Sequence, residues 1–407
     1  MSTPTAKAPP LGYFVSAYPA VSHTFISREV KLLRALGHRI RTCSINRPDR
    51  ERAAMDAEER AEADATWCLK AAGAPAALGA LLSALVTRPL PLLALLRQGW
   101  RLGRGPKGIA YAIEALMVAG WMRREALKHL HVHFGNVGAG IGVLVKAWNS
   151  CHLSLTVHGP DEFDDVPGQQ LAWKMAAADV VICISQFARG QLMRISAPEH
   201  WPKFQVCRLG VDPTQFAFRL REPVTPTRLL CVGRLTPAKC QVLLVQACAK
   251  LRDAGHDFRL TLVGAGPDRP RVEAAIAAGK LAERVTLTGA LTQAQVREAF
   301  DAADVFVLPS LAEGIPVVLM EAMSSGVPCV STPVNGIPEL IEHGRTGLLA
   351  TPGDLDSLVA QLARLITDPP LRHALATAAV EKVRADFDIH RNVRALGAIF
   401  DGFPPSP

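Results

Sequence analysis

Two cations in the C-terminal half have the types and spacing to bind a phosphorylated substrate. Arg234 and Lys239 lie five residues apart, between a predicted strand over 228–233 and a predicted helix over 238–253. Amide N–H groups and the helix dipole at a helix N-terminus attract negative charge, and both side chains would add positive charge there. This turn is therefore predicted to be an anion site. Two solvated surface cations would give the same pattern.

Two carboxylates, Glu313 and Glu321, lie in the segment 304–349. A buried strand is predicted over 304–308, and the helix after it is predicted to begin near Pro316. Eight residues are just over two helical turns, so Glu321 would project from nearly the same face as the helix start. This places both acids at the carboxyl end of a strand, where ligands bind in doubly wound sheets. Two ordinary glutamates on a solvated helix face are the alternative.

The full string around these acids resembles the signature of the family 4 retaining glycosyltransferases, or glycosyl transferases group 1, which have the GT-B fold. The family pattern is a Glu-x7-Glu segment, an EAM-x-x-G-x-P string and a GG-x-x-E turn. The corresponding residues here are Glu313, Glu321, Gly326, Pro328, Asn335, Gly336 and Glu339. Asn335 replaces the first glycine of the turn. Since asparagine tolerates left-handed backbone angles, we expect the turn to form.

The resemblance implies a nucleoside diphosphate sugar as donor and assigns roles to several residues. Family members use the arginine and lysine of a GR-x-x-x-x-KG string on the donor diphosphate. Here these are Arg234 and Lys239, and Cys240 replaces the glycine after the lysine. Glu313 would lie at the donor sugar hydroxyls and Glu321 at the ribose. The other implied donor contacts are Gly233, Gly264, Gly266, Gly314 and Ile315.

Three residues of the N-terminal half are further site candidates. His158 ends a predicted strand over 153–158, where ligands bind in such sheets, although a lone histidine is more often structural. In the family, a histidine or an acid at this place faces the donor sugar. Asp161 would orient His158 or contact a sugar hydroxyl. His23 lies in an acceptor-side segment that resembles the start of bacterial exopolysaccharide and colanic-acid-type enzymes, with local capping or packing as the alternative.

The acidic run over 161–165 is superficially similar to the Asp-x-Asp metal motif of other glycosyltransferases. Metal ligation needs a geometry that this run alone does not establish, and the resemblance implies diphosphate binding without a metal. We therefore expect no metal and no other cofactor. The family is thought to react on one face without a committed protein nucleophile, so no general base is assigned. The catalytic set implied is Arg234, Lys239, Glu313 and His158.

The chain has 407 residues, which is too long for one ordinary domain. Alternating strand and helix patterns in both halves predict an α/β protein. The resemblance makes this the GT-B fold, with two Rossmann-like doubly wound domains that face each other across a cleft. We predict an N-terminal acceptor-side domain over 1–216, a linker over 217–227 and a nucleotide-sugar domain over 228–385. A crossover helix over 386–407 would return to pack on the N-terminal domain.

Composition favours anionic partners. The net charge is +8, which suits nucleotide sugars, lipid diphosphates or a membrane surface, and no block of like charge marks a nucleic-acid arm. Nine scattered cysteines without a CxxC pair indicate reduced thiols in a cytosolic protein. The first ten residues lack the apolar stretch of a signal peptide.

The segment 50–128 is the least familiar part. Residues 71–87 are uncharged but marginal in length for a membrane span, so a soluble or interfacial helix is expected. Basic residues surround Trp100, as in helices that lie in a membrane interface. The alternative is a helical layer that covers the N-terminal sheet and turns its basic side to water.

The predicted reaction is retaining transfer of a sugar from a UDP- or GDP-sugar to a hydroxyl of a glycan or polyprenyl-diphosphate-linked acceptor. Bacterial exopolysaccharide or lipopolysaccharide biosynthesis is the expected setting, in the cytoplasm or at the inner face of the plasma membrane. Other possibilities are a sugar-nucleotide epimerase, transfer to a small soluble acceptor and a non-catalytic binding subunit. A dehydrogenase is disfavoured, because no G-x-G-x-x-G follows the first strand.

Overall fold

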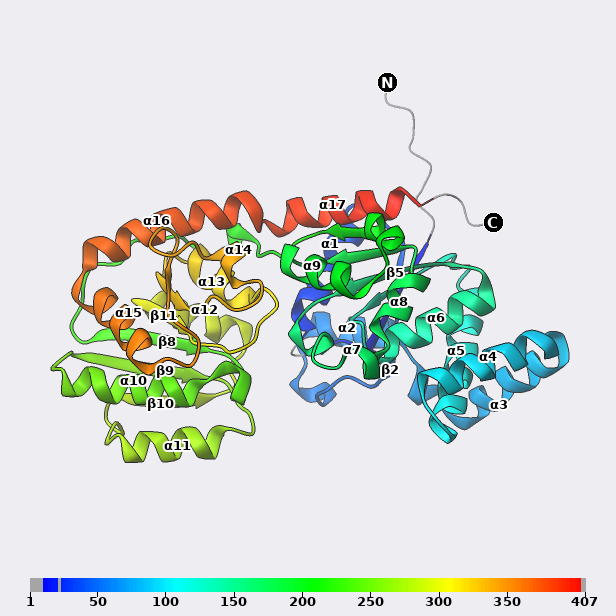
Figure 1. Ribbon diagram of the computed structural model, residues 1–407, viewed down its shortest axis with the longest axis horizontal. Coiled ribbons are helices and arrows are strands. Elements are labelled where there is room, and N and C mark those ends of the chain that lie inside the picture. Colours follow the sequence, from blue (N-terminus) through cyan, green and yellow to red (C-terminus); the bar gives the residue numbers. More distant parts are fainter. Residues whose placement is uncertain (1–9, 21–22, 404–407) are drawn as a thin grey trace, which may run out of the picture. The chain divides into compact units, whose positions relative to one another are not determined.

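The computed structural model describes residues 10–20 and 23–403 and divides the chain into two compact units (Figure 1). Unit 1 comprises Met1–Ile184, Ala188–Cys207 and Arg391–Pro407, and unit 2 comprises Ser185–Phe187 and Arg208–His390. The first ten residues, which lack a signal-peptide pattern, lie outside the described residues up to residue 9. Val21 and Ser22 of the first loop also lie outside them.

Unit 1 contains a sheet of seven parallel strands in the order β3-β2-β1-β4-β5-β6-β7. These strands are short and almost wholly buried, as expected for a parallel sheet with both faces covered. They are β1 Leu11–Ala17, β2 Ile40–Asn46, β3 Trp67–Cys68, β4 His129–His133, β5 His152–Val157, β6 Val180–Cys183 and β7 Phe204–Val206.

Helices cover this sheet in unit 1. They are α1 Thr24–Ala35, α2 Ala57–Ala65, α3 Leu69–Thr87, α4 Pro89–Leu102, α5 Pro106–Arg124, α6 Val137–Asn149, α7 Val166–Gln169, α8 Leu171–Ala177, α9 Gln186–Ile195 and α17 Ile389–Asp401, which enters unit 1 at Arg391. Within 50–128, α5 packs beside α6 on the sheet, and α3 and α4 pack mainly on α5. The expected helical layer over the sheet is therefore largely α5, with α3 and α4 outside it.

Unit 2 contains six parallel strands in the order β10-β9-β8-β11-β12-β13. Successive side chains of β11 alternate between two cores, with Val305 and Val307 in one and Phe306 and Leu308 in the other. Helices therefore lie on both faces of this sheet. The elements are β8 Thr227–Val232, β9 Phe258–Val263, β10 Val285–Gly289, β11 Val305–Leu308, β12 Cys329–Ser331, β13 Leu348–Leu349, α10 Gln241–Asp253, α11 Arg269–Ala278, α12 Gln293–Ala302, α13 Val317–Ser324, α14 Ile337–Leu340, α15 Leu355–Thr367 and α16 Pro369–Asp386.

Strand order reverses once in each sheet, between β1 and β4 in unit 1 and between β8 and β11 in unit 2. Neighbouring connections leave in opposite directions at such a point, and the carboxyl ends of the two strands border an open crevice. The sequence predicts ligand-binding residues at the carboxyl ends of such strands. In unit 2 they follow β8 and β11.

Two predicted boundaries are wrong. The helix expected over 238–253 begins at Gln241, because Pro237 opens a short 3-10 turn and Cys240 adopts a left-handed conformation with φ 57°. Lys239 therefore lies before the helix and not in its first turn. The sequence also predicts a strand over 203–211, the last of the N-terminal half, and the structure limits this strand to Phe204–Val206.

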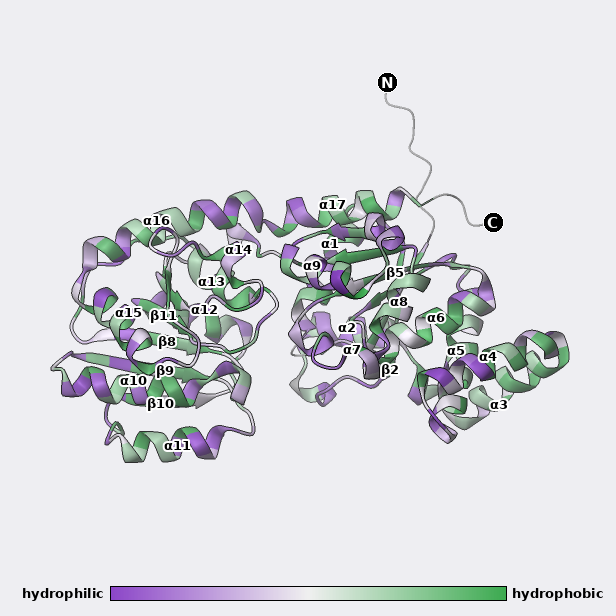
Figure 2. Cartoon of the chain, viewed as in Figure 1, coloured by the Kyte–Doolittle hydropathy of each residue, from purple (hydrophilic) through white to green (hydrophobic). Residues whose placement is uncertain are grey.

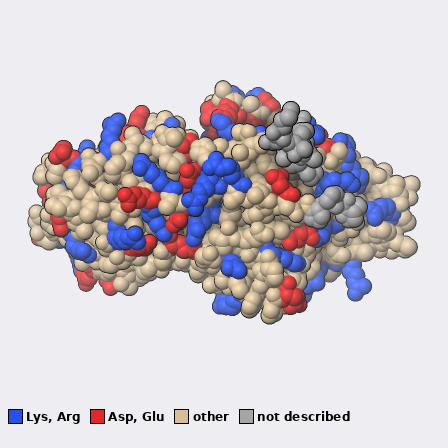
Figure 3. Space-filling model, turned by 90° about the horizontal axis from the view of Figure 1, so that it is seen from above, with Lys and Arg blue, Asp and Glu red and all other residues tan. Residues whose placement is uncertain are grey.

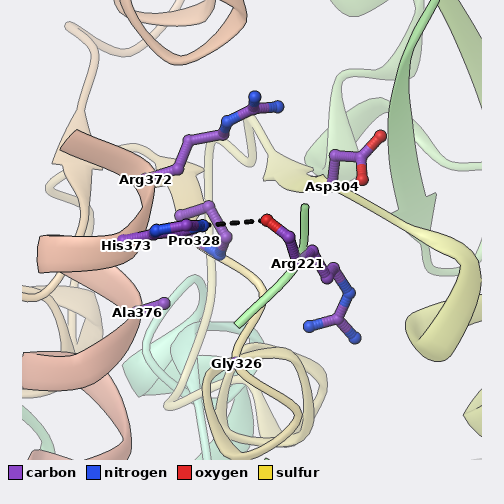
Figure 4. Close-up of a pocket in the computed structure, with 7 residues that line it drawn as sticks. All are labelled: Arg221, Asp304, Gly326, Pro328, Arg372, His373 and Ala376. Carbon is purple, nitrogen blue, oxygen red and sulfur yellow. Dashed lines mark hydrogen bonds between the residues drawn. The ribbon is translucent and has the colours of Figure 1, made fainter. Parts of the chain in front are cut away.

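The segment before β8 is fixed to unit 2 by a polar pocket (Figure 4). The Arg221 guanidinium donates to the carbonyls of Ser325 and Phe300, at 2.8 and 2.9 Å. The His373 ring lies 2.8 Å from the Arg221 carbonyl. Asp304, which is buried, accepts two hydrogen bonds from the Arg228 guanidinium. These contacts anchor the segment before β8 to the rest of unit 2.

Gly264 allows two loops to cross at the end of β8. Its φ is +141°, and a Cβ there would lie 2.0 Å from the Gly233 carbonyl oxygen. Both the backbone angle and the space therefore require glycine.

We predict that Gly264→Ala destabilises unit 2 by about 2 kcal/mol or more, because strain and overpacking add. Thermal unfolding followed by circular dichroism measures the effect. Gly190→Ala is the control, since Gly190 lies in helix α9 with nothing within 4 Å of its added Cβ. It should leave the unfolding temperature unchanged or slightly higher. Equal unfolding temperatures for the two variants would contradict the close approach of the two loops at Gly264.

Candidate functional site

Two loops meet in unit 2 where the strand order reverses. The Leu311 N–H, after β11, donates to the Ala238 carbonyl, after β8, at 2.7 Å. The Lys239 ammonium forms an ion pair with the Glu313 carboxylate. The Ser310 hydroxyl donates to the same carboxylate at 2.7 Å. Two residues from separate motifs, 74 positions apart, are therefore in direct contact.

This ion pair is only partly accessible. The Lys239 side chain is 25% exposed and that of Glu313 is 7% exposed. A buried carboxylate needs its partner, because removing one member leaves an uncompensated charge. Lys239 is consequently held in place by the protein before any ligand arrives. A phosphate oxygen near the ammonium would compete with Glu313 for it.

Arg234 and Glu321 lie on the same two chain segments. Arg234 is in the turn that carries Lys239, with an exposed side chain, and its carbonyl accepts from the Gln241 amide at 3.0 Å. Glu321 is on α13, the helix that follows Glu313, and is half-buried. The structure thus places these two residues on the segments that carry the ion pair.

The predicted glycines bring backbone segments close together. Gly266 lies against Leu235, whose carbonyl oxygen would be 2.2 Å from an added Cβ. The Gly336 N–H donates to the Gly314 carbonyl at 3.1 Å. Ile315 is buried in the core, so only its backbone can face a ligand.

Asn335 has φ 48°, in the left-handed region, which confirms that the turn forms with asparagine in place of the first family glycine. The glutamate of that turn, Glu339, accepts a hydrogen bond from the Phe187 N–H at 2.9 Å and lies 3.5 Å from Arg208. Phe187 and Arg208 both group with unit 2.

In unit 1, His158 ends a chain of buried hydrogen-bonding groups. The Tyr13 hydroxyl donates to Glu29 Oε1 at 2.8 Å, and His133 Nε2 lies 3.2 Å from the same oxygen. His133 Nδ1 lies 2.9 Å from His158 Nε2. A carboxylate beside His133 Nε2 favours the proton on that nitrogen, so Nδ1 accepts from His158 Nε2–H. His158 Nδ1 is then an unprotonated acceptor.

The surroundings of His158 keep it neutral. Burial, with repulsion from His133 and His23, lowers the pKa of His158 well below its usual value. Its ring packs on Phe25 and Phe134, with centroids 4.9 and 4.5 Å away. Among the described residues, no side chain or backbone group hydrogen-bonds Nδ1. A neutral imidazole whose buried acceptor has no partner has the chemistry to bind a hydroxyl group that reaches it.

His23 is brought close to His158 through shared aromatic contacts. The His23 ring centroid is 4.9 Å from that of Phe134, and Phe134 also packs on His158. Asp161 is exposed, in the short turn after β5. The structure therefore brings two of the three candidates in this half together and leaves Asp161 facing solvent.

Glu162 is a residue that sequence reasoning missed. It is buried, and its carboxylate accepts N–H groups of Gly135, His158 and Gly159, the last two at 2.5 and 2.8 Å. It therefore ties the end of β4 to the end of β5 and fixes the backbone that carries His158. The available signal was its place in the acidic run, four residues after His158.

Burial raises the pKa of Glu162 from 4.5 to about 7, against the three amides that stabilise the charged form. Lys174 lies nearby and donates to the carbonyls of Gly135 and Asn136, at 2.8 and 2.7 Å. Burial lowers the pKa of Lys174 to about 8.

Glu29, His131 and His133 offer atoms within 4.8 Å of one another that could hold a metal ion. However, the His131 nitrogens lie 2.8 and 3.1 Å from the Ser154 and Thr156 hydroxyls. Glu29 accepts from the Tyr13 hydroxyl and His133 Nδ1 bonds to His158, whereas His133 Nε2 has no hydrogen-bond partner among the described residues. In the acidic run over 161–165, Asp165 caps α7 by accepting a hydrogen bond from the Gly168 N–H. The donors therefore fit a proton network better than a metal.

Comparison with known proteins gives a consistent result. The model of the family "Glycosyl transferases group 1" matches residues 226–368. The chain is 35% identical over 282 residues to the amylovoran biosynthesis glycosyltransferase AmsK of Erwinia amylovora, covering 66% of this chain and 69% of that protein. It is 36% identical over 229 residues to the putative colanic acid biosynthesis glycosyltransferase WcaL of Salmonella typhimurium, covering 54% of this chain and 56% of that protein.

The fold resembles that of solved GT-B structures. The crystal structure of Anabaena Alr3699/HepE in complex with UDP superposes with a TM-score of 0.74 at 16% identity, covering 97% of this chain and all of that chain. At this identity the likeness concerns the fold, and it confirms the expected GT-B architecture of two Rossmann-like units.

We predict that Glu162 makes stability depend on pH. Because its folded pKa is raised, its contribution is fully present below about pH 4.5 and is lost as the pH rises toward 7. The full loss would be about 3 kcal/mol at most. Denaturant unfolding between pH 4.5 and 8 should show this slope, and Glu162→Gln should flatten it. Asp164→Asn, an exposed neighbour, is the control. An unchanged slope in Glu162→Gln would rule the assignment out.

Proposed function

This chain belongs to the glycosyl transferases group 1 family, and we propose that it transfers a sugar from a nucleoside diphosphate sugar to a hydroxyl group, with retention at the anomeric carbon. The observation that carries the proposal is the contact of Lys239 with Glu313 at the point where the strand order of unit 2 reverses. A cation and a carboxylate held there suit a diphosphate and the sugar attached to it.

The departing diphosphate gains negative charge as the glycosidic bond breaks. Lys239 and Arg234 would stabilise that charge, and Lys239 needs little reorganisation because Glu313 and the loop contacts already position it. When the diphosphate takes the ammonium, Glu313 is released to accept from sugar hydroxyls. No general base is assigned, and no metal is required in this scheme.

Other residues would bind the donor. Glu321 would accept from the ribose hydroxyls. It lies on α13, more than one helical turn beyond the loop that carries Glu313. The backbones of Gly233, Gly264, Gly266, Gly314 and Ile315 would border the nucleotide and the sugar. His158 would accept from a sugar hydroxyl through Nδ1, the nitrogen that is unprotonated when Nε2–H donates to His133 Nδ1. His23 and Asp161 would lie on the acceptor side.

The names of relatives support a biosynthetic setting. AmsK and WcaL are named for amylovoran and colanic acid biosynthesis. These names support a role in exopolysaccharide or lipopolysaccharide biosynthesis. The proposed acceptor is a glycan or a polyprenyl-diphosphate-linked molecule. The donor in this proposal is a UDP-sugar or a GDP-sugar, and the solved neighbour with UDP is compatible with a nucleoside diphosphate at the site. We place the enzyme in the cytoplasm, at the inner face of the plasma membrane.

We predict that Lys239→Ala and Arg234→Ala each lower kcat by about 10²-fold or more, the loss expected when a group that stabilises transition-state charge is removed. Steady-state kinetics with the preferred donor measures this. Lys250→Ala is the control, because Lys250 lies on α10 and pairs with exposed Asp356. Melting curves without donor separate lost folding from lost catalysis. An unchanged kcat in both variants would show that neither side chain stabilises charge in the transition state.

We also predict that one nucleoside diphosphate sugar raises the unfolding temperature, since a ligand that binds only the folded chain stabilises it. A thermal-shift screen of UDP, GDP and their sugar conjugates identifies the donor. The shift should persist in EDTA, because no metal takes part. Absence of any shift would contradict the proposed function, and a shift abolished by EDTA would contradict the metal-free scheme.

A further inference from the structure

Helices α3 and α4 of unit 1 expose a continuous set of large aliphatic side chains. Six of them are more than half exposed: Leu78, Leu82, Leu85 and Val86 on α3, and Leu90 and Leu93 on α4. We name this set the apolar tip. On α3 the leucines are four and three residues apart, which places them on one helix face. Figure 2 shows both helices as predominantly hydrophobic.

The apolar tip is not loose core. The other faces of the two helices are packed, with Ala84, Leu92 and Leu95 buried in the cluster formed with α5. Each helix is therefore apolar on both its inner and its outer side. Soluble proteins rarely expose apolar patches of more than a few hundred Å², and those that do use them for binding.

The charged residues of α3, α4 and the turn after α4 are all basic. From residue 65 to residue 113 the chain has no Asp or Glu, although it has six basic residues: Lys70, Arg88, Arg97, Arg101, Arg104 and Lys107. All six are exposed. At the right-hand end of Figure 3, where α3 and α4 lie, Lys and Arg appear among uncharged residues without acidic ones. Exposed leucines on helices whose charged residues are all basic suit a surface that is apolar inside and anionic at its rim.

A cavity at the base of α3 adds a place for one head group. Its volume is about 610 Å³, and its lining combines the cations Arg88, Arg123 and Lys128 with Ser83, Thr87 and Trp148. The Arg88 guanidinium lies over the Trp148 ring, 5.0 Å from its centroid, and donates to the Trp148 carbonyl at 2.6 Å. Cations and hydroxyls beside an apolar wall fit a lipid phosphate and the start of its chains.

Among the described residues, α3 is long and apolar enough to span a membrane by length and composition. Its backbone argues against a span. Gly73 has φ 70° and interrupts the helix, and Pro75 follows it. The regular part from residue 74 to 87 would be roughly 21 Å long, which is shorter than the hydrocarbon core of about 30 Å. A helix of this length that packs on α5 lies along a surface.

We propose that α3 and α4 dock unit 1 on an anionic phospholipid bilayer. The apolar tip enters the boundary of the acyl chains, and the six basic residues contact lipid phosphates. The inference rests on the proposed function for its purpose, since a lipid-linked acceptor is reached at that surface. Its test needs no donor, so its failure is distinguishable from failure of the proposed function.

The test is co-sedimentation of the full chain with vesicles of phosphatidylcholine, with and without phosphatidylglycerol. Wild type should bind the anionic vesicles and be released by high salt. Leu82→Ser/Leu85→Ser/Val86→Ser/Leu90→Ser should weaken binding at least about tenfold, and Arg97→Gln/Arg104→Gln about tenfold. Leu36→Ser and Arg39→Gln/Arg394→Gln are matched controls from elsewhere in unit 1 and should bind as wild type does.

Three results would overturn the proposal. Wild type could remain in the supernatant with both vesicle types. The serine variant could bind as tightly as wild type, or change only the self-association of the free protein, which would make the tip an interface between copies. The protein in cell membranes could resist both high salt and alkaline extraction, which would make α3 a span. Because the substituted side chains are exposed, melting curves should match wild type.

Discussion

The Lys239–Glu313 ion pair is the interaction around which unit 2 arranges its ligand-binding loops. It joins the loop after β8 to the loop after β11, the two strands between which the sheet order reverses. Separating a buried carboxylate from its cation is costly, so without a ligand the two loops hold one another in position. The Leu311–Ala238 hydrogen bond and the crossing at Gly264 act in the same direction. The geometry of the proposed diphosphate site is thus built before the donor binds.

In unit 1, buried groups keep His158 neutral and favour its proton on Nε2. Tyr13, Glu29 and His133 orient His158 from one side, while Glu162 holds its backbone from the other. Each of these groups is buried, and an unpaired polar group at such a place would be costly. The network therefore specifies one arrangement of the loop after β5. The three histidines spaced by two on β4 share one face of the sheet, since side chains alternate along a strand, but only His133 bonds to His158.

Outside these two sites, the chain differs most from a plain pair of doubly wound domains in α3 and α4. Their inner faces complete the core, and their outer faces carry leucines that a soluble protein would normally replace. The GT-B fold does not require such residues. The proposed docking on a membrane surface would give them a function, and it would bring the proposed enzyme to a lipid-linked acceptor.

The sequence by itself determined the α/β class, the twin pattern and the left-handed turn at Asn335, and it singled out the candidate residues of unit 2, because buried strands, glycine breaks and motif spacing are local properties. It could not show that Lys239 contacts Glu313, since 74 residues separate them and only the neighbouring positions of β8 and β11 bring them together. It misread the helix start at residue 238, because the left-handed Cys240 depends on surrounding loops. Glu162 looked like one acid in a solvated run. Only the tertiary structure buries it, by closing the ends of β4 and β5 around its carboxylate.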